Sequence, residues 1–482
     1  MASLRSARDR LTRARSSYLD GAYTSVQLLL LAGALLLGFG IVMAASTTIS
    51  ASLHNSANGG TIWSQLVKEG MFVSLGLPVL WLGLRLPPRA YRLLAYPILL
   101  IALLLLLAVL VPHVGVTING AQRWLAIGPF QLQPSEFAKF AMLLWGADLL
   151  ARKEDLKSLK RVSHVMVPLV PAFGVVILLV MLEPDLGTTL CFLIILLGLL
   201  WTVGLPMRYF AGIVASVAGA VTVLAITEPY RLERLTSFTD PFKDAQNTGH
   251  QAVQGLYALS SGGVFGVGLG SGTSKFGWVP NANSDYIFSI IGEELGLLGC
   301  LAVLASFGLL AYSAVRVARR SNDAFIRLAT SGTAVWLCGQ ALINIGYVTG
   351  LLPVTGIPLP FVSAGGTSLV LTMGVLGMLV SFARHEPDAV RAAQRDARTK
   401  QRSRLVRWLH LGVPRMAGSR RPRPQRTQNR RPAVNRPAAR PTPVRRPAPA
   451  RQRQPARSLT VRTVPVARQT LRPTGTEGPR RR

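Results

Sequence analysis

The chain carries ten apolar runs that are each long enough to cross a lipid bilayer, and no other feature constrains its fold as strongly. A helix needs about 20 predominantly apolar residues to span the hydrocarbon core. The runs lie at 24–46, 67–85, 92–112, 134–150, 164–182, 186–204, 208–227, 286–315, 325–349 and 362–383. Half of the 482 residues are hydrophobic and only 15% are charged, which excludes an ordinary soluble domain. We therefore expect an all-α polytopic membrane protein with ten transmembrane helices.

Basic residues indicate the orientation of these helices. They gather in the N-terminal segment, at Arg85–Arg92, at Arg152–Arg161, at Arg208, at Arg316–Arg327 and after Arg384. Ten crossings place all of these segments on one side, so the positive-inside rule predicts that both termini are cytoplasmic. The basic N-terminal segment precedes an apolar run that is too long for a signal peptide. We expect this apolar run to be the first spanning helix.

Three parts of the chain follow from this pattern: a basic cytoplasmic segment at 1–23, a membrane domain at 24–385 and a tail at 386–482. After residue 390 there are 27 Arg or Lys residues against two acidic ones, which accounts for most of the net charge of +32. This Arg- and Pro-rich tail should be disordered. Its charge favours anionic inner-leaflet lipids, with docking of a protein partner as the alternative. No nucleic-acid-binding fold accompanies the charge, so we expect no nucleic-acid partner.

The membrane domain contains one large extracytoplasmic loop, at 228–285, between the seventh and eighth spans. Polar residues interrupt apolar ones at near-helical spacing in 250–260, which predicts a short helix there. The glycine-rich stretch Gly262–Gly270 follows no strand and opens no βαβ unit, so a nucleotide site is excluded. It is more typical of tight backbone packing beside a substrate or another helix.

Cysteine usage indicates neither disulfides nor a metal cage. Cys191, Cys300 and Cys338 lie in apolar runs without a CxxC motif or a nearby His. No cofactor is evident, and no ligand cluster supports a divalent cation.

Charged residues stand where the fourth span begins. Gly120–Trp124 is followed by Gln133–Lys139, and ionisable groups beside lipid usually mark a functional site. Lys139 follows Glu136 by three residues, so both lie on one helical face. Pro134 suits the first turn and Glu136 suits the positive end of the helix dipole. The competing interpretation is thus a well-capped helix with a local ion pair.

Four further acidic residues lie toward the outer side. Asp185 stands in the turn Glu183–Thr188 and Asp285 stands just before the eighth span, and each also suits an N-cap. The adjacent pair Glu293 and Glu294 lies inside that span and must pair, face water or stay protonated. The structural interpretation pairs these two acids with a basic residue such as Arg123 or Lys139.

The tenth span opens with the proline- and glycine-rich stretch Leu359–Ser368. Its backbone amides suit an anion, although an ordinary turn is the alternative. Cations and a carboxylate beside lipid together suit a membrane-borne substrate with a phosphate leaving group.

These motifs resemble the SEDS family (shape, elongation, division and sporulation proteins) over about residues 20–385. The resemblance rests on Gly120–Trp124 with Gln133–Lys139, on Glu183–Thr188, on Pro280–Gly296 and on Pro353–Ser368. It implies a peptidoglycan glycosyltransferase that polymerises lipid II together with a class B penicillin-binding protein transpeptidase. The wording of the motifs and the long basic tail favour a division member at the septum, with an elongation member as the near alternative. A division member's tail would face cytoplasmic divisome proteins such as the FtsZ filament.

The resemblance also implies roles for individual residues. Asp285 occupies the position of the family's essential aspartate, as general base, and Arg123 and Lys139 would handle the diphosphate. Further substrate-site positions are Glu136, Asp185 and Ser363. Structural or positioning roles fall to Trp124, Gln133, Pro134, Ser135, Glu293, Glu294, Pro360, Gly365 and Gly366. Family members often carry an acidic residue and then Ala-His-Thr before the aspartate, whereas this chain has Asn281–Ser284, so a His-assisted proton relay is missing there.

Two readings from other classes remain open: a lipid II flippase and a non-catalytic divisome scaffold. A flippase predicts charges along a continuous path through the membrane, but the charged candidates here gather at the outer face. A scaffold predicts that Asp285 is dispensable.

Overall fold

The computed structural model describes most of the membrane domain. The described residues are 21–56, 64–118, 121–128, 130–156, 162–227, 238, 240–246, 249–399 and 412–414. The predicted N-terminal segment up to residue 20 and nearly all of the predicted tail beyond residue 399 lie outside them. The predictions for those segments therefore stay predictions.

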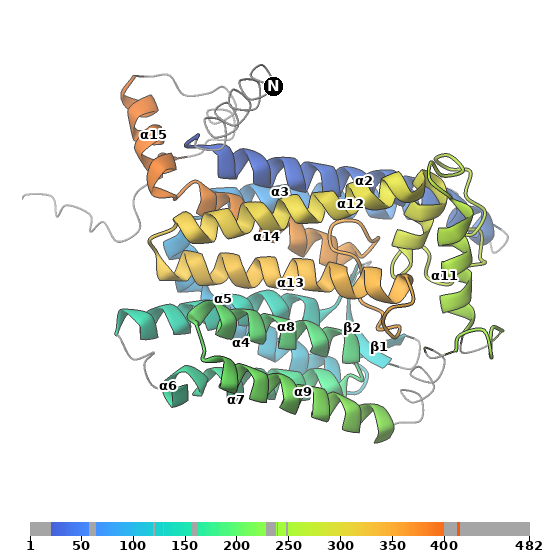
Figure 1. Cartoon of the computed structure of the whole chain (residues 1–482), viewed down its shortest axis with the longest axis horizontal. Helices are drawn as coiled ribbons and strands as arrows, with labels where there is room; N and C mark the ends of the chain where they lie inside the picture. The colour runs from blue at the N-terminus through green and yellow to red at the C-terminus, as the bar shows by residue number, and fades with distance from the viewer. Residues whose placement is uncertain are drawn as a thin grey trace, which may run out of the picture. The chain divides into compact units, whose positions relative to one another are not determined.

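Long helices form most of the described structure and lie side by side (Figure 1). They are α2 (Thr24–Ser56), α3 (Ser64–Arg85), α4 (Pro88–Leu110), α5 (Pro134–Asp155), α6 (Val162–Met166), α7 (Leu169–Leu182), α8 (Leu186–Val203), α9 (Met207–Thr227), α11 (His250–Ser261), α12 (Ile287–Arg320), α13 (Ala324–Val348), α14 (Gly366–Ala383) and α15 (Pro387–Arg398). The helix α12 packs against α2, α11 and α13, and α13 also packs against α5 and α8. The helix α11 confirms the short helix predicted at 250–260.

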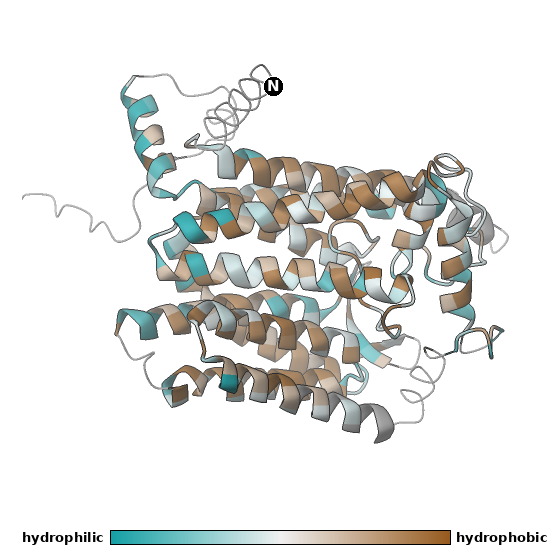
Figure 2. Ribbon diagram, viewed as in Figure 1, coloured by the Kyte–Doolittle hydropathy of each residue, from teal (hydrophilic) through white to brown (hydrophobic). Residues whose placement is uncertain are grey.

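Among the described residues, eight helical segments are long and apolar enough to span a membrane. They are Thr24–Thr47, Val67–Arg85, Pro88–Leu110, Val162–Leu182, Leu186–Val203, Ile287–Arg320, Ala324–Val348 and Gly366–Ala383. Apolar residues cover their middle parts, and polar residues gather toward their ends (Figure 2). Large apolar side chains point outward, as with Leu93, which is 80% exposed, and Leu178, which is 62% exposed. These features are those of a polytopic integral membrane protein, whose outer side chains contact lipid.

The other two predicted spans, at 134–150 and 208–227, are helices α5 and α9 but are not among these eight. In α5 the reason is its charge, since Glu136, Lys139 and Asp148 all lie within the helix. All three side chains are buried against other helices, at 5% exposure or less. The charges that lower the hydropathy of α5 therefore face protein rather than lipid.

A small sheet corrects the all-α prediction. Its strands β1 (Gly115–Ile118), β2 (Ala121–Ile127) and β3 (Phe130–Leu132) form an antiparallel meander in the segment that joins α4 to α5. Trp124 pairs with Val116 in the ladder. The Gln122 side-chain amide donates to the carbonyl oxygens of Val109 (2.8 Å) and Val111 (3.1 Å), which ties the sheet to the end of α4. The sheet lies at the same end of the helices as α11 (Figure 1).

Glycine lets α3 and α14 approach each other closely. A Cβ atom added at Gly377 would lie 2.4 Å from the Leu80 carbonyl oxygen, and one at Gly83 would lie 2.9 Å from the Gly374 carbonyl oxygen. Small residues at a helix–helix interface permit such backbone contact inside a membrane.

The helix α15 corrects the prediction that the chain is disordered from residue 386 onward. It begins with Pro387 in its first turn and buries Ala389 and Val390. The Tyr23 hydroxyl donates to the Asp396 carboxylate at 2.9 Å, and Arg320 lies 3.9 Å from Asp388. Two buried apolar side chains and these polar contacts order a segment whose composition alone predicts disorder.

Candidate functional site

Arg123 on β2 reaches across to the turn that joins α7 and α8. Its Nε donates to the Glu183 carbonyl oxygen at 3.0 Å, and its Nη2 donates to the Pro184 carbonyl oxygen. Its Nη1 lies 4.0 Å from the Asp185 carboxylate. The Arg123 side chain keeps 32% of its surface exposed, so its guanidinium remains accessible.

Asp185 is the N-cap of α8, as its alternative interpretation predicted. One carboxylate oxygen accepts from the Thr188 backbone amide at 3.0 Å, and the other accepts from the Thr188 hydroxyl at 2.8 Å. The side-chain amide of Gln133, which is the N-cap residue of α5, donates to Asp185 at 3.3 Å. Asp185 therefore connects the starts of α5 and α8 to Arg123.

Glu183 is a buried carboxyl group that the sequence analysis did not single out. Its side chain has 0% exposure, and neither carboxyl oxygen has a hydrogen-bond partner within the described residues. Burial and the negative charge of Asp185 raise the pKa of the Glu183 carboxyl to about 8, and the positive charge of Arg123 partly opposes this rise. We infer that Glu183 is protonated at neutral pH.

Glu183→Gln is expected to make the protein more stable at pH 8 and to flatten the pH dependence of its unfolding. In the folded state Glu183 keeps its proton up to about pH 8, whereas the unfolded chain releases it near the ordinary carboxyl pKa of 4.5. The folded state thus binds more protons between these values, and its stability falls as pH rises across this window. Thermal unfolding in detergent from pH 5 to 9 measures this slope. Asp155→Asn, at an exposed carboxyl, is the control, and equal slopes for wild type and Glu183→Gln would contradict the assignment.

Glu136 and Lys139 form the ion pair that their spacing predicts. Lys139 Nζ lies 2.8 Å from Glu136 Oε1, and Lys139 is only 1% exposed. The ammonium also lies 5.5 Å from the centre of the Trp336 ring, and it donates to Gln340 Oε1 at 3.3 Å. The structure thus places Lys139 in the protein interior, whereas Arg123 is partly exposed.

Asp285 stands one residue before the N-cap of α12, which is Tyr286. The N-cap interpretation of Asp285 is therefore wrong by one position. Its backbone carbonyl oxygen accepts from the Asn344 side-chain amide at 2.9 Å and from the Tyr347 hydroxyl at 2.9 Å. Its carboxylate lies on the side of Gly356, since a Cβ atom added there would be 3.8 Å from Asp285 Oδ2.

Ser363 fixes the backbone that precedes Asp285. Its hydroxyl donates to the Ser284 carbonyl oxygen at 2.6 Å and accepts from the Leu359 amide at 2.7 Å. The amide of Ala364 donates to the Asn283 carbonyl oxygen at 2.9 Å, and the amide of Gly365 donates to the Ser363 carbonyl oxygen at 2.8 Å. These amides already have partners, so the anion-binding interpretation of this turn is wrong for them.

The short segment Thr355–Ile357, which is neither helix nor strand and has Gly356 at φ 70°, lies between Asp185 and Asp285. On one side a Cβ atom added at Gly187, in the first turn of α8, would be 2.7 Å from the Thr355 carbonyl oxygen. On the other side the segment contacts Asp285 through Gly356. The helix starts that carry Asp185 and Asp285 therefore flank the same short stretch of backbone.

A family model described as "Cell cycle protein", FtsW/RodA/SpoVE, matches residues 26–388 of this chain. The chain belongs to this family. The SEDS resemblance of its motifs is thereby confirmed, and every site residue named above lies within the matched region.

Curated members of the FtsW/RodA/SpoVE family are similar over most of their length. A protein of Mycobacterium tuberculosis named "Probable peptidoglycan glycosyltransferase FtsW" is 42% identical over 81% of this chain and 74% of its own. A protein of the same name from Thioalkalivibrio sulfidiphilus is 38% identical over 72% of this chain and 86% of its own.

Solved structures of the FtsW/RodA/SpoVE family share the fold. The rod shape determining protein RodA of Thermus thermophilus is 28% identical with a TM-score of 0.54, covering 74% of this chain and 96% of its own. A chain from "Structural coordination of polymerization and crosslinking by a peptidoglycan synthase complex" is 29% identical with a TM-score of 0.59, covering 74% and 97%.

A polar face of α13 connects Lys139 to the backbone of Asp285, and it was not predicted from the sequence. Gln340 accepts from Trp336 Nε1 at 2.9 Å and donates to the Pro358 carbonyl oxygen at 2.9 Å. Asn344 donates to the Ile357 carbonyl oxygen at 2.8 Å. The signal was present, because Gln340 and Asn344 are four residues apart in an otherwise apolar span and therefore share a face.

The two acids inside α12 pair differently from the prediction. The basic partner of Glu294 is Lys275, at 2.6 Å, and not Arg123 or Lys139. Glu293 accepts instead from the backbone amides of Thr273 (2.8 Å) and Ser274 (3.2 Å). In the part of the chain that the structure describes, no three His, Cys, Asp or Glu side chains gather as a metal-ligand set would.

Proposed function

We propose that this chain is a peptidoglycan glycosyltransferase that polymerises lipid II into glycan strands. The observation that carries the proposal is the arrangement around Thr355–Ile357. Asp285 lies against one side of this segment, while Asp185 with its neighbour Arg123 lies toward the other. A carboxylate and an accessible cation at the same end of a membrane domain suit a lipid-linked diphosphate substrate. The names of the curated relatives support the same activity.

In the proposed reaction, Asp285 is the general base. Its carboxylate takes the proton from the 4-hydroxyl of the acceptor sugar as the hydroxyl oxygen attacks the anomeric carbon of the donor. A new C–O bond forms at that carbon, the bond to the diphosphate oxygen breaks, and undecaprenyl diphosphate leaves with the electron pair. Asn344, Tyr347 and Ser363 hold the backbone on either side of the carboxylate.

Arg123 is the proposed direct contact of the diphosphate. A guanidinium binds phosphate oxygens in a planar, charge-assisted geometry, and here it is already oriented by the two carbonyl groups of the Glu183–Pro184 turn. Lys139 has an indirect role. It pairs with Glu136 and donates to Gln340, and Gln340 in turn donates to the Pro358 carbonyl oxygen. Glu136 and Asp185 then position the substrate-binding residues.

The finer topology belongs to the same proposal. With α5 and α9 counted as spans, ten helices cross the membrane and both termini are cytoplasmic, which puts β1–β3 and α11 on the outer side. There the chain meets a class B penicillin-binding protein transpeptidase. The septum is the proposed location, because the curated relatives carry the division name FtsW.

The test combines the purified chain with the class B transpeptidase of its own genome and lipid II, and it follows glycan polymer on gels. We expect polymer that depends on this chain and persists when a β-lactam blocks the transpeptidase. A parallel assay follows fluorescent lipid II across liposomes that contain the chain alone. Translocation without polymer would mean that the chain is a flippase. The absence of both polymer and translocation would mean that it is a scaffold.

A further inference from the structure

The helix α12 is broken at Gly296, and a glycine-rich segment fills the break. Gly296 has φ 68° and ψ −165°, a conformation essentially restricted to glycine. The carbonyl oxygens of Glu293 and Glu294 accept from the amides of Val267 (2.9 Å) and Gly268 (3.1 Å). Beyond the break, the amides of Leu297 and Leu298 donate to the carbonyl oxygens at 263 (3.0 Å) and 264 (3.3 Å). Residues 263–268 thus satisfy the backbone groups that the break exposes.

The fit between the segment and the break requires the absence of side chains. A Cβ atom added at Gly266 would lie 2.2 Å from the Glu294 carbonyl oxygen, and one at Gly262 would lie 1.9 Å from the Gly292 carbonyl oxygen. The glycine run therefore packs backbone to backbone against α12, as the sequence analysis expected of it.

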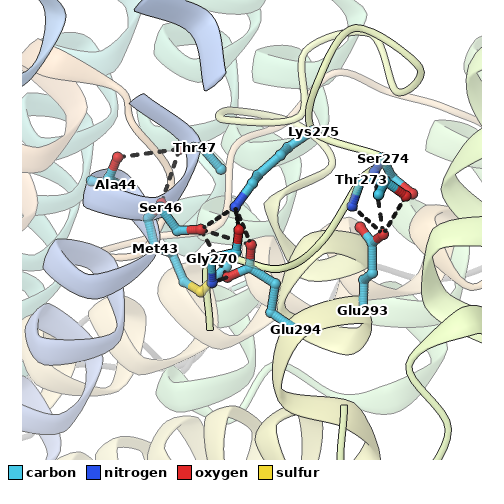
Figure 3. Close-up of polar contacts among 10 residues, drawn as sticks. All are labelled: Met43, Ala44, Ser46, Thr47, Gly270, Thr273, Ser274, Lys275, Glu293 and Glu294. Carbon is cyan, nitrogen blue, oxygen red and sulfur yellow. Dashed lines mark hydrogen bonds and ion pairs between the residues drawn. The ribbon is translucent and has the colours of Figure 1, made fainter. Parts of the chain in front are cut away.

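A buried ion pair between Lys275, which follows this segment, and Glu294 of α12 holds the segment against the helix (Figure 3). Lys275 Nζ lies 2.6 Å from Glu294 Oε1 and also donates to the Gly270 carbonyl oxygen at 2.9 Å. Ser46 of α2 donates to Glu294 Oε1 at 2.7 Å, and Lys275 donates to the Ser46 hydroxyl at 2.8 Å. Lys275 is 6% exposed and Glu294 is 1% exposed, so the group is shielded from solvent.

Asp285 lies within the loop that this ion pair closes. Lys275 and Glu294 are 19 residues apart in the sequence, and Asp285 falls between them. The stretch carries the end of the outer segment, the Asp285 turn and the first part of α12, before the break at Gly296. Glu293, whose carboxylate accepts from the amides of Thr273 and Ser274, adds a second link between its two ends.

We propose that Lys275, Glu294 and Ser46 form a latch that holds the first part of α12, and with it Asp285, in place against α2. Lys275 and Glu294 are positioning residues and not catalytic ones, since both side chains are buried and paired with each other. A buried ion pair contributes little net stability. Separating its partners leaves an unpaired buried charge, which disfavours any arrangement that moves Glu294 away from Lys275. The break at Gly296 makes such a latch necessary, since it uncouples the short first part of α12 from the long remainder of the helix. The proposal rests on Asp285 being the base of the proposed function.

The test uses Lys275→Met, Glu294→Gln and the double variant in the full chain bound to its transpeptidase. Lys243→Met, at an exposed lysine of the same outer segment, is the matched control. Hydrogen–deuterium exchange is expected to rise in peptides covering 263–275 and 286–290 while α13 stays protected. In the polymerisation assay kcat is expected to fall about tenfold or more with KM within about twofold, because a shifted base impairs the chemical step.

The double variant separates positioning from simple damage by an unpaired charge. It leaves no buried charge without a partner, so we expect it to recover folded yield while exchange stays raised and kcat stays low. Full recovery of exchange and kcat would overturn the latch, as would a folded Lys275→Met protein with wild-type exchange at 286–290. Raised exchange with unchanged kcat would overturn the positioning role. If the unmodified complex makes no polymer, the proposed function fails, and exchange at 286–290 alone decides the latch.

Discussion

Asp285→Asn is expected to reduce lipid II polymerisation by at least about 100-fold, which is the low end of what a general base contributes. Asparagine has nearly the same shape but cannot accept the proton of the acceptor hydroxyl. The contacts that fix this position involve the backbone carbonyl, which accepts from Asn344 and Tyr347 and which the substitution leaves in place. The variant should therefore fold and bind its transpeptidase like the wild type. Initial rates of polymer formation at saturating lipid II measure the effect.

The matched control is Asp240→Asn, which changes an exposed carboxylate on the same outer segment. We expect its rate to equal that of the wild type. Equal polymer from Asp285→Asn and the wild type would show that the base lies elsewhere. A variant that loses transpeptidase binding or thermal stability would reveal a structural role for Asp285.

Gly296→Ala is expected to destabilise the membrane domain by about 3 kcal/mol or more, since conformational strain and overpacking add together. The added methyl group would lie 2.4 Å from the Gly266 amide nitrogen and 2.5 Å from the Val264 carbonyl oxygen. Both neighbours are backbone atoms that are hydrogen-bonded or packed into the break, so neither can move aside alone. The segment 263–268 must then leave α12. Thermal unfolding and the yield of monodisperse protein in detergent measure this loss.

Gly308→Ala is its control on the same helix. Gly308 is exposed, and a Cβ atom there would meet no atom within 4 Å. Alanine is a better helix former than glycine, so this variant should be unchanged or more stable by about 0.5–1 kcal/mol. Equal stability of the two variants would mean that the break in α12 is not required for folding.

Several parts of the site were predictable because they depend on neighbours in sequence. The Glu136–Lys139 pair follows from three-residue spacing on a helix, and the capping role of Asp185 follows from its place before α8. The packing role of Gly262–Gly270 and the helix α11 were likewise readable from local composition and spacing.

The errors arose where a partner comes from a distant segment. Glu294 needed a cation, but Lys275 was reachable only through the fold of the outer segment, and Ser46 comes from the first span. The low hydropathy of α5 could not reveal that its charges face other helices. Glu183 is notable because its side chain is buried and its carboxyl has no hydrogen-bond partner among the described residues. Neither property is visible in the sequence.

The sequence by itself determined that this protein lies in the membrane, which segments form its long helices, and to which family its motifs belong. These properties depend on local hydrophobicity and on residues close together in the chain. Only the tertiary structure decided which charges meet, that α12 is broken at Gly296, and that Thr355–Ile357 lies between Asp185 and Asp285. The physical reason is that ion pairs and backbone contacts between distant segments depend on how the helices pack, and many pairings are compatible with the same set of helices.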